Sequence, residues 1–182
     1  MTDRPRDWLA AAAHELGESR VALWCADLIT ESVDPADPAA PPLESVSSHP
    51  GTYYLERAAA GDPEPDYWPR VWGARGLLYV WDDRAEAAVV QGLQDEAWRV
   101  REMCAKVVRL REIGAAGDRL AELCADDVPR VRVAALRALS RVGESEHLPA
   151  VHAAGEDEEP TVVAAADDAL EELGERLDRD VD

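Results

Sequence analysis

The chain has 182 residues, of which 38 are acidic and 19 are basic, and 47% of its residues are hydrophobic. This length and apolar content are sufficient for one folded domain with a core, and they exclude a disordered acidic tail. The net charge of −19 repels phosphate groups and anionic lipids, so the composition argues against nucleic-acid binding and membrane binding.

The sequence predicts a cytoplasmic protein that uses no metal or cofactor. It contains no apolar run of the roughly 18 residues that a membrane-spanning helix needs, and no cleavable signal peptide is evident. Cys25, Cys104 and Cys124 are odd in number and widely spaced, which favours buried thiols over disulfides or a zinc site. Arginine outnumbers lysine eighteen to one, a bias that we attribute to a GC-rich bacterial genome.

The N-terminal third predicts a helical hairpin followed by an irregular segment. Apolar residues recur at helical spacing over residues 6–16 and 18–31. We therefore expect residues 1–33 to form an N-terminal capping hairpin. Five prolines within residues 34–51 exclude a regular helix and indicate a loop. A short helix is expected over residues 52–60.

A short motif then recurs four times, with starts 29, 31 and 31 residues apart. In every copy an aspartate stands five residues before a valine, and small or apolar residues follow at helical spacing. Glycines after three of these segments are expected to cap the helices. The motif pairs are Asp66 and Val71, Asp95 and Val100, Asp126 and Val131, and Asp157 and Val162, and the glycines are Gly114, Gly143 and Gly174.

Shorter amphipathic segments over residues 85–93, 119–124 and 148–154 separate the long helices. Each repeat is therefore a helix, a tight turn that carries the aspartate, and a second helix. One such hairpin cannot bury its own apolar face, whereas a stack of hairpins can. We predict an all-α fold: a right-handed α-solenoid of about five helical hairpins in a single domain. The repeats are expected over residues 52–177, most clearly over 66–177, with an acidic tail at 178–182.

The motifs Asp95-x4-Val100-Arg101, Asp126-x4-Val131-Arg132 and Asp157-x4-Val162 resemble HEAT repeats, specifically the short phycobilisome-lyase-like subclass of the armadillo-type fold. The resemblance implies a ladder of charged hydrogen bonds between neighbouring repeats, formed by the turn aspartate and the arginine after the valine. Trp72 and Val163 occupy the arginine position in the first and last copies, where the ladder is expected to end. The ladder residues so implied are Asp95, Arg101, Asp126, Arg132 and Asp157.

Charge is unevenly distributed along the chain. Residues 67–141 carry 13 basic and 11 acidic residues, whereas the segments on either side are strongly acidic. Nine of these basic residues fall on the second helices of the middle repeats, which line the concave face in HEAT-like stacks. One interpretation is that they are ladder members and solvated helix faces. The other is that Arg99, Lys106, Arg109 and Arg137 bind an acidic peptide or protein.

A second candidate binding locus is a set of aromatic residues. Trp68, Trp72, Arg75 and Tyr79 follow the spacing i, i+4, i+7 and i+11, which predicts one stripe on one helix. Such stripes are typical of a core or of the seam between a cap and the first repeat. Other apolar residues already give this helix a buried face, so the stripe is expected to pack on the Pro-rich loop or on a partner. Tryptophan, tyrosine and arginine are the usual anchors of interfaces, so this stripe is the preferred binding locus.

No catalytic motif is evident, because the four histidines share no pattern and no phosphate loop or nucleophile with a base appears. We therefore expect a non-enzymatic scaffold or adaptor, a monomer or weak homodimer, that binds a partner protein on the concave face of its repeats. Two alternatives stay open. One is an enzyme of the chromophore-lyase type, which the subclass suggests. The other is a relative of the HEAT-like DNA glycosylases, which need a strongly basic groove.

Overall fold

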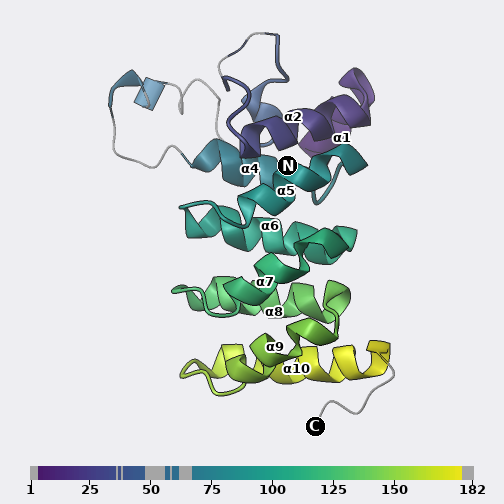
Figure 1. The fold of residues 1–182 in the computed structure, drawn as a ribbon. Helices are drawn as coiled ribbons and strands as arrows, with labels where there is room; N and C mark the ends of the chain where they lie inside the picture. The colour runs from purple at the N-terminus through teal and green to yellow at the C-terminus, as the bar shows by residue number, and fades with distance from the viewer. Residues whose placement is uncertain are drawn as a thin grey trace. The chain divides into compact units, whose positions relative to one another are not determined.

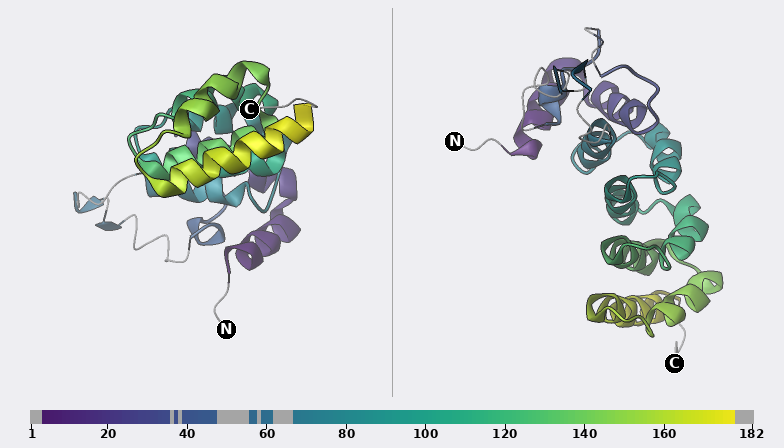
Figure 2. Two further views of the ribbon diagram at one scale, coloured as in Figure 1. Left: turned by 90° about the horizontal axis from the view of Figure 1, so that it is seen from below. Right: turned by 90° about the vertical axis from the view of Figure 1, so that its left-hand side faces the viewer.

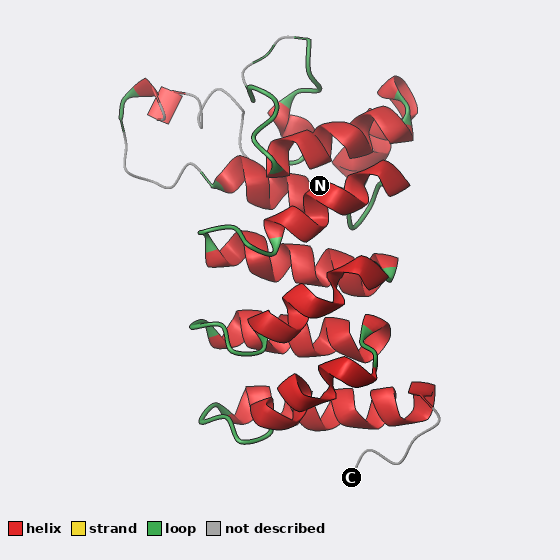
Figure 3. Cartoon of the chain, in the orientation of Figure 1, coloured by secondary structure: helices red, strands yellow, loops and turns green. Residues whose placement is uncertain are grey.

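All regular elements in the described part of the chain are helical, as predicted (Figures 1 and 3). None of these helices is both long and apolar enough to cross a membrane. The chain divides into two compact units, residues 1–91 and residues 92–182. The computed structural model describes residues 4–35, 37, 39–47, 56–57, 59–61 and 67–177.

The first unit begins with the predicted hairpin, formed by α1 (Pro5–Leu16) and α2 (Glu18–Ile29). In the described part of the segment that follows, the only helical element is the short 3-10 helix η1 (Leu43–Ser45), so the prolines act as expected. The helix expected over residues 52–60 lies largely outside the described residues, as do Asp66 and the expected tail at 178–182.

The helix α4 (Trp68–Gly76) packs on α2. Its glycines permit this approach, because a Cβ on Gly73 would collide with the carbonyl oxygen of Cys25 and one on Gly76 would lie 2.5 Å from the Cys25 sulfur. The unit continues with η2 (Asp83–Ala85) and α5 (Glu86–Gly92), which confirm the short helix expected over residues 85–93.

The second unit contains three long and two short helices that follow the predicted order. The long helices α6, α8 and α10 lie side by side in one layer, and α7 and α9 form the other layer (Figure 2, right). The motif valines Val100, Val131 and Val162 are completely buried. The α-solenoid prediction is therefore confirmed. The helices are α6 (Trp98–Arg111), α7 (Gly117–Leu123), α8 (Pro129–Val142), α9 (Leu148–Ala154) and α10 (Pro160–Leu177).

Two of the three expected glycine caps are wrong. Helix α6 ends at Arg111, and Glu112 takes the left-handed conformation with a φ of 54°, while Gly114 opens the 3-10 helix η3 (Gly114–Ala116). Gly174 is buried inside α10, where the helix formers after it continue the helix to Leu177. Gly143 does follow the end of α8, but its backbone is extended rather than left-handed.

Candidate functional site

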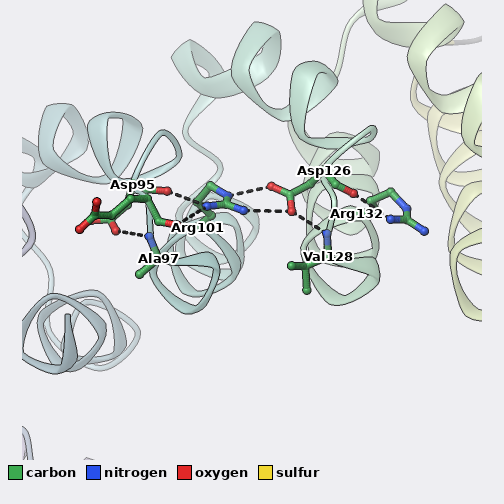
Figure 4. A network of polar contacts seen from close by, with 7 residues as sticks. Asp95, Ala97, Arg101, Asp126, Val128 and Arg132 are labelled. Carbon is green, nitrogen blue, oxygen red and sulfur yellow. Dashed lines mark hydrogen bonds and ion pairs between the residues drawn. The ribbon is translucent and has the colours of Figure 1, made fainter. Parts of the chain in front are cut away.

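The aspartate turns of the second unit are joined to one another by arginines (Figure 4). The Nε and Nη2 atoms of Arg101 donate to the carboxylate of Asp126 at 2.7 and 3.1 Å. The Nη1 atom of the same guanidinium donates to the carbonyl oxygen of Asp95 at 2.7 Å. Arg101 thus connects its own turn to the turn of the next repeat.

Arg132 makes the same connection one repeat later. Its Nη1 donates to the carbonyl oxygen of Asp126 at 2.8 Å, and its Nη2 donates to the carboxylate of Asp157 at 2.8 Å. The bond from Arg132 lowers the pKa of the Asp157 carboxyl below its ordinary value. Each turn aspartate also accepts a hydrogen bond from the backbone amide two residues further on. The five ladder residues thus serve the stacking of repeats, which leaves other side chains to contact a ligand.

A second polar cluster lies where α6 and α8 begin. The guanidinium carbon of Arg99 lies 4.3 Å from the centroid of the Trp98 ring, and that of Arg130 lies 5.4 Å from it. Both distances allow cation–π attraction. The ring therefore holds two guanidinium groups from neighbouring helices at one place on the surface.

Glu102 links the same two helices. Its side chain is 9% exposed and accepts hydrogen bonds from Lys106 Nζ at 2.8 Å and from Arg130 Nη2 at 3.0 Å. The two cations remain open to solvent, with exposed side-chain fractions of 44% for Lys106 and 67% for Arg130. One buried carboxylate thus orients two exposed positive charges and neutralises only one of them.

Arg109 and Arg137 are exposed, and neither forms an ion pair with a carboxylate among the described residues. By contrast, Arg141 pairs with Glu112 at 2.7 Å. Helix α8 contains no acidic residue, and α6 contains only Glu102. The result is a positive surface on a strongly negative chain. We call it the basic face and define it by Arg99, Lys106, Arg109, Arg130 and Arg137.

The middle of the second unit is similar in sequence to a known repeat family. Residues 118–145 match the family model of the HEAT repeat. This segment is therefore similar to a HEAT repeat. The matched segment covers most of α7 and all of α8, including the ladder residues Asp126 and Arg132. No curated protein matches the chain in sequence. The hairpins on either side of the matched segment carry the same aspartate turn, so this segment lies within a series of similar hairpins.

The aromatic residues predicted as a binding stripe lie in the first unit, outside the matched residues 118–145. The rings of Trp68 and Trp72 stack with their centroids 6.2 Å apart, and Trp72 is only 8% exposed. Arg75 donates to the carbonyl oxygen of Val46 in the Pro-rich loop, and burial lowers its pKa. Arg75 therefore contacts this loop, as one of the two expectations for the stripe requires.

The prediction that all four stripe residues lie on one helix is wrong for Tyr79. Helix α4 ends at Gly76, because the amides of Leu78 and Tyr79 turn back to the carbonyl oxygens three residues earlier. Tyr79 lies in this turn and is 43% exposed. Tyr79 thus lies beyond the end of the helix that carries the other members of the stripe.

A surface pocket of about 470 Å³ is present in the first unit, between α2 and the loop after it. Leu23, Trp24 and Pro41 contribute apolar walls. Its charged lining residues are two arginines, Arg20 and Arg84, and two aspartates, Asp27 and Asp37. Because these charges balance, the pocket favours neither an anionic nor a cationic ligand.

The three thiols are free and buried. Burial raises the pKa of Cys25 and of Cys124 to about 12, and it also raises the pKa of Cys104. Such thiols stay protonated near neutral pH and are poor nucleophiles and metal ligands. Among the described residues, no group of three or more histidine, cysteine or acidic side chains is placed to hold a metal ion.

Sequence reasoning selected Arg99, Lys106, Arg109 and Arg137 but missed the roles of Glu102 and Arg130. The i, i+4 spacing of Glu102 and Lys106 was a usable signal, since such pairs meet on one side of a helix. The bond from Arg130 to Glu102 joins residues 28 positions apart. No local pattern reports a contact of that kind.

Proposed function

We propose that this chain is a non-enzymatic interaction module that binds an acidic segment of a partner protein on the basic face. Stacked helical repeats present extended surfaces to partners, and the HEAT repeat within the second unit supports this class of function. The observation that carries the proposal is the pair Arg109 and Arg137, which are exposed on adjacent helices without carboxylate partners in the described part of the chain.

The overall composition makes this pair unusual. Acidic residues outnumber basic residues by two to one, so an exposed arginine has many chances of finding a carboxylate on its own chain. Surface ion pairs contribute only about 0.2–1 kcal/mol each, so binding requires several cations acting together. The basic face provides five cations, two of which, Arg109 and Arg137, form no ion pair with a carboxylate in the described part of the chain.

The test uses a fluorescein-labelled peptide of about eight glutamates, long enough to cross two helices about 10 Å apart in an extended chain. Fluorescence anisotropy at low salt would measure its affinity for the wild type and for the double variant Arg109→Glu, Arg137→Glu. We expect the variant to bind at least about tenfold more weakly, because two attractive charges become repulsive.

The control variant is Arg20→Glu, Arg119→Glu. It changes the net charge by the same amount, but Arg20 lies on α2 and Arg119 lies on the short helix α7. We expect it to lose much less affinity than the variant of the basic face. Equal losses in the two variants would show that only the net charge matters and would contradict the proposal, as would a wild type that does not bind the peptide. Circular dichroism would establish that both variants keep their helices.

A further inference from the structure

The charge of the long helices in the second unit changes sign from one end of their layer to the other. Helix α6 carries five basic residues and one acidic residue, and α8 carries four basic residues and none that is acidic. Helix α10 carries five acidic residues and one basic residue. The layer is therefore positive over two helices and negative over the third.

These charges share one side of the layer because the repeat period places them in register. Lys106, Arg137 and Asp168 succeed one another at intervals of 31 residues, and Glu171 stands two such periods after Arg109. Since α6, α8 and α10 lie side by side (Figure 2, right), equivalent positions point to the same side. The acidic members on α10 are Asp168, Glu171, Glu172 and Glu175, which we call the acidic face.

The two faces do not neutralise each other within the chain. Asp168 and Glu171 are exposed and form no ion pair with a cation among the described residues. Arg137 on the neighbouring helix is also exposed and forms no ion pair with a described carboxylate. Within the acidic face, Glu172 accepts a hydrogen bond from Ser140 Oγ at 2.5 Å. Both signs of charge therefore remain open to a partner.

We propose that the partner segment is itself bipolar, with an acidic stretch that contacts α6 and α8 followed by a basic stretch that contacts α10. This inference rests on the proposed function and specifies its partner. A uniformly acidic segment gains attraction over the basic face but meets repulsion where it reaches α10. An extended chain advances about 3.3 Å per residue and adjacent helices are about 10 Å apart, so the segment needs about six acidic residues and then about three basic ones.

A second copy of the chain also carries both faces and is the competing occupant. Each copy has a net charge of −19, so two copies repel each other as they approach. A segment whose own charges nearly cancel meets no such repulsion. The charge balance thus favours a bipolar segment of another protein.

The experiment compares two labelled peptides of identical composition, one with an acidic block followed by a basic block and one with the same residues alternating. A third peptide carries the acidic block alone. Binding to the full chain is measured by fluorescence anisotropy at low salt. We expect the block peptide to bind at least about fivefold more tightly than the alternating one, because only the block places each sign over its complement.

The double variant Asp168→Lys, Glu171→Lys gives the decisive readout. It should weaken binding of the block peptide and strengthen binding of the acidic peptide, so the two effects have opposite signs. A variant with the same charge change at exposed positions outside α10, Glu146→Lys, Glu156→Lys, should strengthen the binding of both peptides slightly or leave it unchanged.

Several results would overturn the inference. Equal affinity for the block and alternating peptides would do so, as would a gain in affinity for both peptides in the Asp168→Lys, Glu171→Lys variant. In either case the acidic peptide still binds and still depends on Arg109 and Arg137, so the proposed function stands. A wild-type dimer in sedimentation velocity that this variant dissociates would make a second copy the occupant. No binding of any peptide would remove both proposals together.

Discussion

The carboxylate of Asp126 is 5% exposed and accepts two hydrogen bonds from Arg101 and one from the Val128 amide. Changing Asp126→Ala removes these acceptors and leaves the guanidinium of Arg101, itself only 16% exposed, without its carboxylate. We expect a loss of about 1–3 kcal/mol in the free energy of unfolding, measured by urea denaturation. The neighbouring exposed Asp127 is the control, and Asp127→Ala should change stability by less than about 0.5 kcal/mol. Equal effects would show that the ladder bond does not stabilise the stack.

Asp157 makes the ladder sensitive to pH. The hydrogen bond from Arg132 lowers the pKa of its carboxyl below the ordinary value of 3.8. A carboxyl with a lower pKa in the folded state stabilises the protein above its unfolded pKa, and this stabilisation is lost as the pH falls through the folded pKa. Wild type should therefore exceed Asp157→Asn in urea midpoint near pH 7, and the difference should shrink between about pH 4 and pH 2. A difference that is constant over this range would contradict an ionic role for Asp157.

At the scale of elements, the fit of one hairpin on the next depends on Gly117, the first residue of α7. A Cβ at this position would lie 2.6 Å from Cε1 of His147, whose ring is held by the Glu144 amide donating to Nδ1 at 2.8 Å. We expect Gly117→Ala to lower the free energy of unfolding by about 1–3 kcal/mol. Gly114→Ala is the matched control, because nothing lies within 4 Å of a Cβ there.

A double-mutant cycle identifies the contact responsible. When Gly117→Ala is combined with His147→Ala, the alanine at 117 no longer meets the imidazole ring. The double variant should therefore lose less free energy of unfolding than the sum of the losses of the two single variants. Strict additivity in thermal or urea unfolding would show that the strain from a Cβ at this position arises elsewhere.

At the scale of the whole molecule, the excess of 19 negative charges opposes the compact state through mutual repulsion. Raising NaCl from about 10 mM to about 100 mM shortens the Debye length from about 30 Å to about 10 Å. We expect the midpoint of thermal unfolding at neutral pH to rise over this range, because exposed like charges are screened more than the half-buried ladder pairs. A fall in the midpoint would indicate that attractive surface pairs outweigh the repulsion.

Most of the fold was accessible from the sequence because its signals are local. The short helix expected over residues 119–124 is α7 at Gly117–Leu123, and the one expected over 148–154 is α9 at the same bounds. Helical periodicity shows which residues are buried whatever the neighbouring element is. The glycine caps failed for the opposite reason, since an end such as Glu112 depends on the packing around it as well as on propensity.

The candidate site could be predicted only in part from the sequence. The sequence indicated which arginines lie on the second helices. Whether each arginine is paired depends on residues that are distant in the chain. Arg130 reaches Glu102, and Arg75 reaches Val46 in the Pro-rich loop, 29 residues earlier. In the sequence, the aromatic stripe was the preferred candidate for binding, ahead of the basic residues. Packing distinguished them by burying Trp72 and leaving Arg109 and Arg137 exposed.

The all-helical stack follows from the sequence alone, because a period of 31 residues and a recurring Asp-x4-Val motif encode each hairpin within its own length. Its repetition also placed Asp126 and Arg101 at positions where neighbouring turns could pair. Long-range packing decides which cations are neutralised and which side of the layer carries both signs of charge. Those features depend on atoms brought together from segments 25 or more residues apart, and no local pattern specifies how closely two packed helices approach.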